Sequence, residues 1–136
     1  MKLLMIYTDY FSVTPNIKTL EDAEDVSGSI EYKDSLIGLI HVEEEDEEKA
    51  GNVETKLVKN LKWAARKNDT NRIVLHSFAH LSESNASPDF AKMIFDNTES
   101  RLINADYEVS QTPFGYFHHL ELKAPGYSLA RLFKSF

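Results

Sequence analysis

The fold class follows from one stretch of the sequence, RIVLHSFAHLSESNASPD at residues 72–89. Residues 72–78 are apolar and β-branched, as in a buried strand. Ser87 is then a good N-cap, Pro88 suits the first helical position and Asp89 suits the first turn, so a helix begins there and runs to about Asn104. A strand followed this soon by a helix predicts a domain in which helices pack on a sheet.

The segments on both sides extend this pattern. We expect further strands at 2–7, 36–42, 107–111 and 114–122, and an amphipathic helix at 53–67 capped by Asn52. The first strand is apolar enough to be central, and the last can pair antiparallel with its predecessor. The order predicts an α/β (α+β) fold with a mixed or largely antiparallel sheet and two packed helices. We expect the amphipathic tail after residue 126 to lead toward a linker.

Composition limits the class of protein. The chain has 136 residues, enough for one domain with a real core. It has no Cys, which excludes disulfides, thiolate metal sites and a Cys nucleophile and favours an intracellular protein. No apolar run approaches the length of a membrane span, so we expect no membrane segment.

The charges are unevenly distributed. The net charge of −7 argues against a nucleic-acid protein, yet six of the 22 acids are the run Glu43–Glu48, which we expect to be a solvated loop. The helix at 53–67 carries its basic residues on the side opposite its apolar stripe. This side is either a solvent-exposed helix face or a surface that faces phosphates. These bases are Lys56, Lys59, Lys62, Arg66 and Lys67.

Known catalytic and metal motifs are absent. The five glycines never approach the spacing of a phosphate-binding loop. His76 and His80 are separated along a strand and its end, and His118 and His119 point to opposite faces of a strand, so we expect no metal site.

Two segments remain as candidates for a pocket, residues 77–82 and 112–117. Each places a small residue, Ala79 or Gly115, beside aromatic residues at a strand end, where the backbone can approach a ligand. His80 is either a structural group or a general base, and Phe114-Gly115-Tyr116 is either core and turn or a pocket wall.

The same segments, Phe78-Ala79-His80-Leu81-Ser82 and Thr112-Pro113-Phe114-Gly115-Tyr116, resemble the N-terminal editing domain of archaeal threonyl-tRNA synthetases, a relative of the D-aminoacyl-tRNA deacylases. Residues 4–10, 40–42 and 126–130 follow the family's order, so the resemblance covers nearly the whole chain. It implies a D-aminoacyl-tRNA deacylase-like fold, with the sheet closing toward a partial barrel, in a single domain at residues 1–136 that forms the N-terminal part of a longer synthetase.

The resemblance implies a proofreading hydrolase that removes L-serine from tRNA(Thr) and spares threonine, without metal or cofactor. A second site shaped around serine can exclude the extra methyl group by a clash. The implied partners are the 3′-terminal adenosine of tRNA(Thr) carrying L-serine, a second copy of the chain, and the synthetase's catalytic domain in cis or in trans, all in the cytoplasm. The alternatives are a D-aminoacyl-tRNA deacylase and a non-catalytic tRNA-binding or dimerisation module.

Site residues are implied in the same way. In the family picture a water is activated with help from the 2′-hydroxyl of the adenosine, and backbone donors meet the oxyanion. His80 and His118 are the implied catalytic side chains, and the implied substrate-binding residues are Val42, Phe78, Ala79, Phe114, Gly115, Tyr116 and Phe117. Many relatives carry Tyr-Lys at Phe117-His118 and an acid at Arg131, so the chain departs from the family there.

Overall fold

The computed structural model describes residues 1–136 and contains one mixed sheet with two helices, which confirms the predicted fold class. The helices are α1 (Ala50–Lys67) and α2 (Pro88–Asn104), with short 3₁₀ turns η1 (Glu44–Glu48) and η2 (Ser128–Ala130). The strands are β1 (Lys2–Lys18), β2 (Ile30–His41), β3 (Arg72–Ser77), β4 (Glu108–Gln111), β5 (Tyr116–Lys123) and β6 (Arg131–Ser135).

The strand order is β4-β3-β2-β1-β5, with β6 also paired to β1. The pairs β2–β3 and β3–β4 are parallel, and the three pairs made by β1 are antiparallel. The first half of β1 pairs with β6 and its second half with β5, so β1 is the central strand that its apolar start predicted. No helix of the structure is long and apolar enough to cross a membrane.

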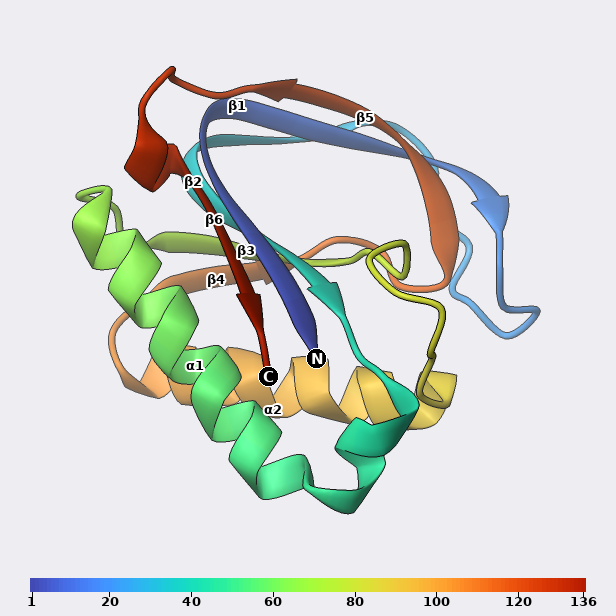
Figure 1. Ribbon diagram of the computed structural model, residues 1–136. Coiled ribbons are helices and arrows are strands. Elements are labelled where there is room, and N and C mark those ends of the chain that lie inside the picture. Colours follow the sequence, from blue (N-terminus) through green and yellow to red (C-terminus); the bar gives the residue numbers. More distant parts are fainter.

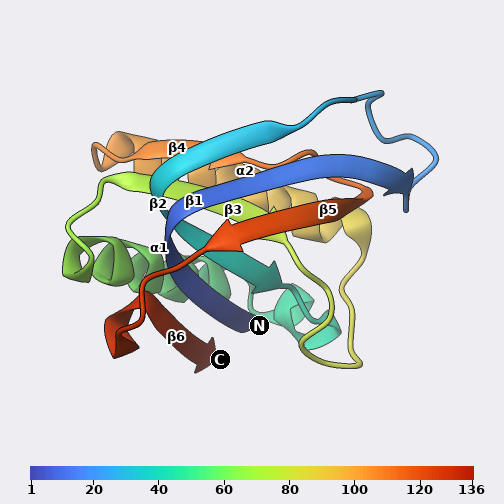
Figure 2. The same cartoon turned by 90° about the horizontal axis from the view of Figure 1, so that it is seen from above.

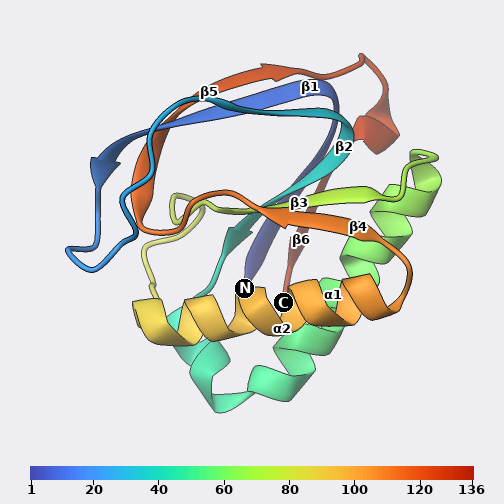
Figure 3. The ribbon, with the colours of Figure 1, turned by 180° about the vertical axis from the view of Figure 1, so that it is seen from behind.

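The sheet bends so strongly that it covers part of its own surface. Both helices lie on one side, while β5 and the outer half of β1 lie over the other side (Figure 1, Figure 3). Phe11 and Val13 of β1 are therefore fully buried against Val74 and the centre of β2. This second cluster supplements the larger core between the helices and the sheet.

Helix α1 buries the predicted apolar stripe, including Val53, Leu57 and Leu61. Its start differs from the prediction, because Lys49 rather than Asn52 occupies the N-cap position. Helix α2 begins as predicted, with the Ser87 side chain accepting a hydrogen bond from the Phe90 N–H at 3.2 Å.

The predicted hairpin between residues 107–111 and 114–122 is wrong. Strand β4 pairs only with β3, whereas β5 pairs with β1. Pro113 supplies no backbone donor, and Gly115 has φ +87°, so the chain leaves the β4 edge and crosses to β1. In the tail, residues 131–135 form β6 and pair with β1.

The acidic run is not wholly solvated. Glu43 and Asp46 are buried, and the ammonium of Met1 lies 2.6 Å from a Glu43 oxygen and 3.0 Å from Asp46. Burial raises the pKa of Glu43, but hydrogen bonds from the Met1 ammonium, Ser82 and Lys2 outweigh it and lower the pKa to about 2. The prediction failed here because it considered only the repulsion among the acids of the run. It did not include the Met1 ammonium, which comes from a distant segment of the chain.

Candidate functional site

A cavity of about 250 Å³ lies where the ends of β2 and β3 meet the start of β5. Because β2 and β3 are parallel, their carboxyl ends reach the same edge of the sheet, and the bend of β1 brings β5 across them. The cavity gathers six predicted site residues from distant parts of the chain. They are Val42, Ala79, Phe114, Gly115, Tyr116 and His118.

The connection at residues 78–86 is fastened to the end of β2. The Phe78 N–H donates to the Ile40 carbonyl at 2.9 Å, and the Ala86 N–H donates to the Val42 carbonyl at 3.1 Å. Ala79 is thereby held at the rim by backbone bonds on both sides of its loop.

His41 completes this fastening and was missed by sequence reasoning. Its Nδ1 accepts hydrogen bonds from the N–H groups of Leu81 and Ser82 at 3.0 and 3.1 Å, and its Nε2 donates to the Ser84 carbonyl at 2.7 Å. The ring is fully buried. Its position in an apolar run was a signal, since a buried imidazole needs partners.

Gly115 permits a close approach of two segments. Its φ of +87° disfavours any L side chain, and a Cβ there would lie 2.9 Å from the Cβ of Ala23. Its carbonyl accepts a hydrogen bond from the Thr19 N–H at 2.8 Å. The Tyr116 hydroxyl, which donates to the Glu24 carbonyl and accepts from the Val26 N–H at 3.1 Å, holds the same 19–26 segment. Tyr116 therefore offers its ring to the cavity, while its hydroxyl is committed to this loop.

His118 is a neutral acceptor in the cavity wall. Burial lowers its pKa, and its Nε2 donates a hydrogen bond to the Pro113 carbonyl at 2.9 Å. Its Nδ1 is buried without a partner. In this tautomer Nδ1 carries a free lone pair, so it can accept a hydrogen bond from a ligand but cannot attract an anion.

His76 packs beside His118 with 5.4 Å between the ring centroids. Burial, and then the neighbouring His118 and His80, lower the pKa of His76 to about 4. Its Nδ1 lies 2.9 Å from the Thr112 hydroxyl. This buried imidazole is neutral, so it adds no charge beside His118.

The backbone around the cavity contains unused donors. The N–H groups of Ala79, Phe114 and Gly115 donate to no protein acceptor. Free amides on two facing segments are the arrangement that stabilises a developing oxyanion.

The remaining predicted residues lie outside the cavity lining. The exposed ring of His80 packs edge-on against Phe78 with centroids 4.9 Å apart, and stacks on Phe117 with centroids 6.0 Å apart and 24° between the planes. Phe117 is 52% exposed. No group of three or more His, Asp or Glu side chains is placed to hold a metal ion.

A larger cavity of about 670 Å³ adjoins the first and shares Phe114 and Pro113 with it. Five carboxylates and one lysine line it, namely Asp22, Glu24, Asp89, Asp96, Glu99 and Lys92. This excess of negative charge disfavours a polyanionic ligand, whereas the lining of the smaller cavity contains no carboxylate.

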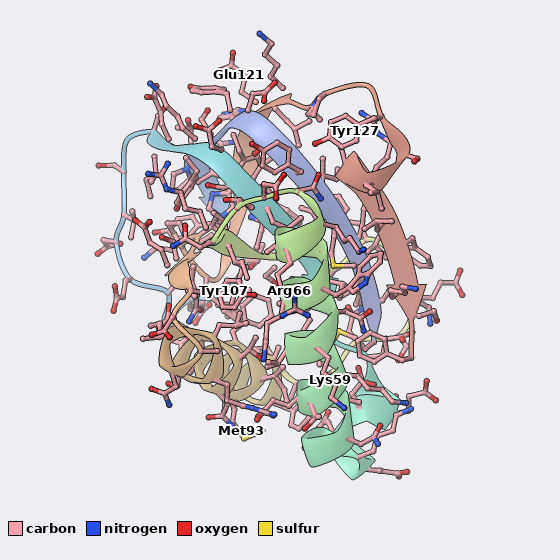
Figure 4. All side chains as sticks on the ribbon, turned by 90° about the vertical axis from the view of Figure 1, so that its left-hand side faces the viewer. Lys59, Arg66, Met93, Tyr107, Glu121 and Tyr127 are labelled. Atoms are coloured by element: carbon pink, nitrogen blue, oxygen red, sulfur yellow. The ribbon has the colours of Figure 1, made fainter.

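The basic residues of α1 form a separate surface. Lys56, Lys59, Arg66 and Lys67 are exposed, and Figure 4 shows Lys59 and Arg66 projecting from the helix. In Figure 1 the C-terminal part of α1 lies at the left, whereas the 78–87 loop lies at the right. The basic residues in the C-terminal part of α1 therefore do not adjoin the 78–87 loop.

Comparison with known proteins gives consistent results. Residues 1–136 match the archaea-specific editing domain of threonyl-tRNA synthetase. The chain is 34% identical over 134 residues to threonine–tRNA ligase of Methanosphaera stadtmanae and 33% identical over 135 residues to that of Thermococcus sibiricus. Each alignment covers 97% of this chain and 22% of the relative, so the chain spans about a fifth of their length.

A solved structure shows the same fold. The c-Myc DNA Unwinding Element Binding Protein superposes with a TM-score of 0.68 over 99% of this chain and 98% of its own, at 13% sequence identity.

Proposed function

Because the chain belongs to the archaea-specific editing domain family of threonyl-tRNA synthetases, we propose that it is a proofreading hydrolase that deacylates L-seryl-tRNA(Thr) and spares threonyl-tRNA(Thr). One observation carries the proposal: the cavity is lined by residues whose backbone N–H groups donate to no protein acceptor and by a neutral histidine whose Nδ1 is unpartnered. Such a site suits hydrolysis of an ester that is already activated by its attachment to a ribose.

The reaction needs little from the side chains. A water oxygen adds to the serine carbonyl carbon with help from the ribose 2′-hydroxyl, and the N–H groups of Ala79, Phe114 and Gly115 stabilise the oxyanion. The bond from that carbon to the ribose oxygen then breaks, the ribose oxygen takes a proton, and serine leaves. Val42 and Ala79 supply main-chain contacts to the serine or the adenosine.

His118 acts in this picture as a positioning acceptor. Its unpartnered Nδ1 accepts a hydrogen bond from the substrate's amino group or hydroxyl group. This differs from a lysine at the same place, which can only donate. His80 contacts the substrate from the rim, where Phe78 and Phe117 support its ring.

Selection between serine and threonine rests on exclusion. We infer that the cavity of about 250 Å³, which Phe114, Gly115 and Tyr116 line, excludes the extra methyl group of threonine by a clash. A synthetic site that accepts threonine gains only about 10- to 200-fold against a substrate smaller by one methyl group, so a second site of this kind is required.

A challenge with three substrates separates the candidate functions. L-seryl-tRNA(Thr), L-threonyl-tRNA(Thr) and a D-aminoacyl-tRNA are incubated with the chain, and release of the amino acid is followed. The proposal predicts rapid loss of the L-seryl ester alone. Cleavage of the D-ester would favour a D-aminoacyl-tRNA deacylase, and no cleavage would favour a non-catalytic tRNA-binding or dimerisation module.

We also propose that the domain works in the cytoplasm as a homodimer, together with the synthetase's catalytic domain. Leu120 and Leu122 of β5 and Phe133 of β6 are 43–53% exposed, and both strands are laid along β1 (Figure 2). A second copy would cover these apolar side chains. Sedimentation at micromolar concentration should give twice the chain mass of 15.6 kDa, and a single-chain mass would contradict the dimer.

A further inference from the structure

We propose that Phe117, backed by the His80 ring, is a stacking platform for the base of the nucleotide that precedes the terminal adenosine of the substrate. This inference rests on the proposed function and adds a second contact to the tRNA end. The cavity would hold the esterified ribose of the terminal adenosine, and the platform would hold the preceding nucleotide of the single-stranded tRNA end.

The position of Phe117 at the rim follows from its neighbours. Tyr116 and His118 both line the cavity, and side chains alternate along a strand, so the Phe117 side chain points to the opposite face of β5. Likewise His80 directly follows the cavity residue Ala79. The two segments that form the cavity therefore also form the stack beside it.

The stack offers a supported aromatic face. Phe78, His80 and Phe117 form a column with centroid separations of 4.9 and 6.0 Å. Phe117, at its outer end, is 52% exposed, and its register partner on β1, Ile17, is 58% exposed. Isolated exposed apolar side chains are common, but here an aromatic ring is fixed by other rings next to a site for a nucleotide ester.

The chemistry of this surface selects a nucleobase. Single-stranded nucleic acid is held by bases stacking on exposed aromatic rings, and Phe117 carries no polar atom that could read a base edge. The platform should therefore accept any base but should not tolerate the loss of the base. The single-stranded tRNA end could also leave the site across the acidic cavity on the other side of Phe114. The carboxylates of that cavity would repel its phosphates, which makes this path unfavourable.

The test compares a long and a short substrate. L-seryl-tRNA(Thr) contains the preceding nucleotide, whereas 3′-O-L-seryl-adenosine lacks it. We expect Phe117→Ala to raise KM for the tRNA by roughly 5- to 150-fold more than it raises KM for seryl-adenosine, corresponding to the loss of one stacked base. Phe117→Trp should keep the low KM. Ile103→Ala, at an exposed apolar residue of α2, is the matched control.

The outcomes are distinguishable. An equal loss with both substrates would overturn the platform and place Phe117 in the chemical step, and no loss with either would also overturn it. If wild-type protein hydrolyses neither substrate, the proposed function fails, and binding tests the platform alone.

For that binding test, the Phe117→Trp change is made in a Trp63→Phe background, which leaves one indole. An oligonucleotide that ends in cytidine-cytidine-adenosine and carries no amino acid should quench its fluorescence, and an oligonucleotide without the penultimate base should bind at least 5-fold more weakly. Equal binding of the two oligonucleotides would contradict the platform.

Discussion

His76 and His118 show how single residues set the character of the site. Both imidazoles have a lowered pKa because burial disfavours the cation, and each has one ring nitrogen engaged by the 112–113 turn. His118 lines the cavity with an unpartnered Nδ1 that can accept a hydrogen bond, and the neutral His76 ring beside it adds no charge.

The lowered pKa of His76 predicts a loss of stability in mild acid. The unfolded chain takes up a proton at His76 near pH 6.5, whereas the folded chain resists protonation until about pH 4. The free energy of unfolding should therefore fall between pH 6.5 and 4, by on the order of 3 kcal/mol if His76 dominates.

Urea unfolding at pH 7 and pH 5 measures this dependence. Both pH values lie above pH 4.5. Below that pH, protonation of Glu43 begins to remove the contribution of Glu43 to the free energy of unfolding. His76→Gln should reduce the difference to the part that His118 contributes, and His119→Gln, at an exposed histidine, should keep it. An undiminished difference in the His76→Gln variant would show that another group is responsible.

At the residue level, the sequence predicted much of the cavity but little of its support. Ala79 and Gly115 were identifiable because small residues beside aromatics at strand ends allow close backbone approach. The roles of His41 and of the Tyr116 hydroxyl were not, because each depends on a backbone group that is distant in the sequence.

At the level of elements, α1 is the best candidate for contact with the tRNA body. Its C-terminal part lies away from the 78–87 loop (Figure 1), so the basic residues there would meet the duplex phosphates rather than the 3′ end, and Figure 4 shows Lys59 and Arg66 projecting from the helix. The sequence left a solvated helix back as the alternative, and the exposure of the lysines is compatible with both interpretations.

Charge reversal decides between them. Combined Lys56→Glu, Lys59→Glu and Lys62→Glu should weaken tRNA binding and reduce the slope of log affinity against log salt by about 1 for each phosphate that the helix no longer neutralises. The single variant Lys59→Glu is measured as well, and Lys33→Glu, at an exposed lysine of β2, is its matched control. If the affinity for tRNA and its salt dependence are unchanged, the basic face of α1 is only a solvent-exposed helix face and does not contact the tRNA.

Helices and core strands were predictable because their periodicity is local, but strand partners were not. Strand β5 could have paired with β4 by proximity, yet the outer half of β1, residues 8–18, offers β5 a longer partner. That half shows no continuous apolar run, which is why its strand went unrecognised.

At the level of the whole molecule, the bend of β1 makes the site. It lays β5 over the carboxyl ends of β2 and β3 and so closes a cavity that no single segment contains. Sequence reasoning could predict the two halves of the site but not their closure, because the bend depends on burial of Phe11 and Val13 against Val74.

The central claim is that this cavity performs the deacylation. The most direct measurement is kcat/KM for L-seryl-tRNA(Thr) with wild type and Ala79→Leu, where the added side chain would fill the space between the free backbone N–H groups. Ala124→Leu serves as the control, with thermal unfolding to confirm that both variants fold.

The account predicts a decrease of roughly 100-fold or more for Ala79→Leu, because small displacements of an ester from its donors cost about that much. Ala124→Leu should retain the wild-type value. A wild-type kcat/KM in the folded Ala79→Leu variant would contradict the account and place the chemistry elsewhere on the molecule.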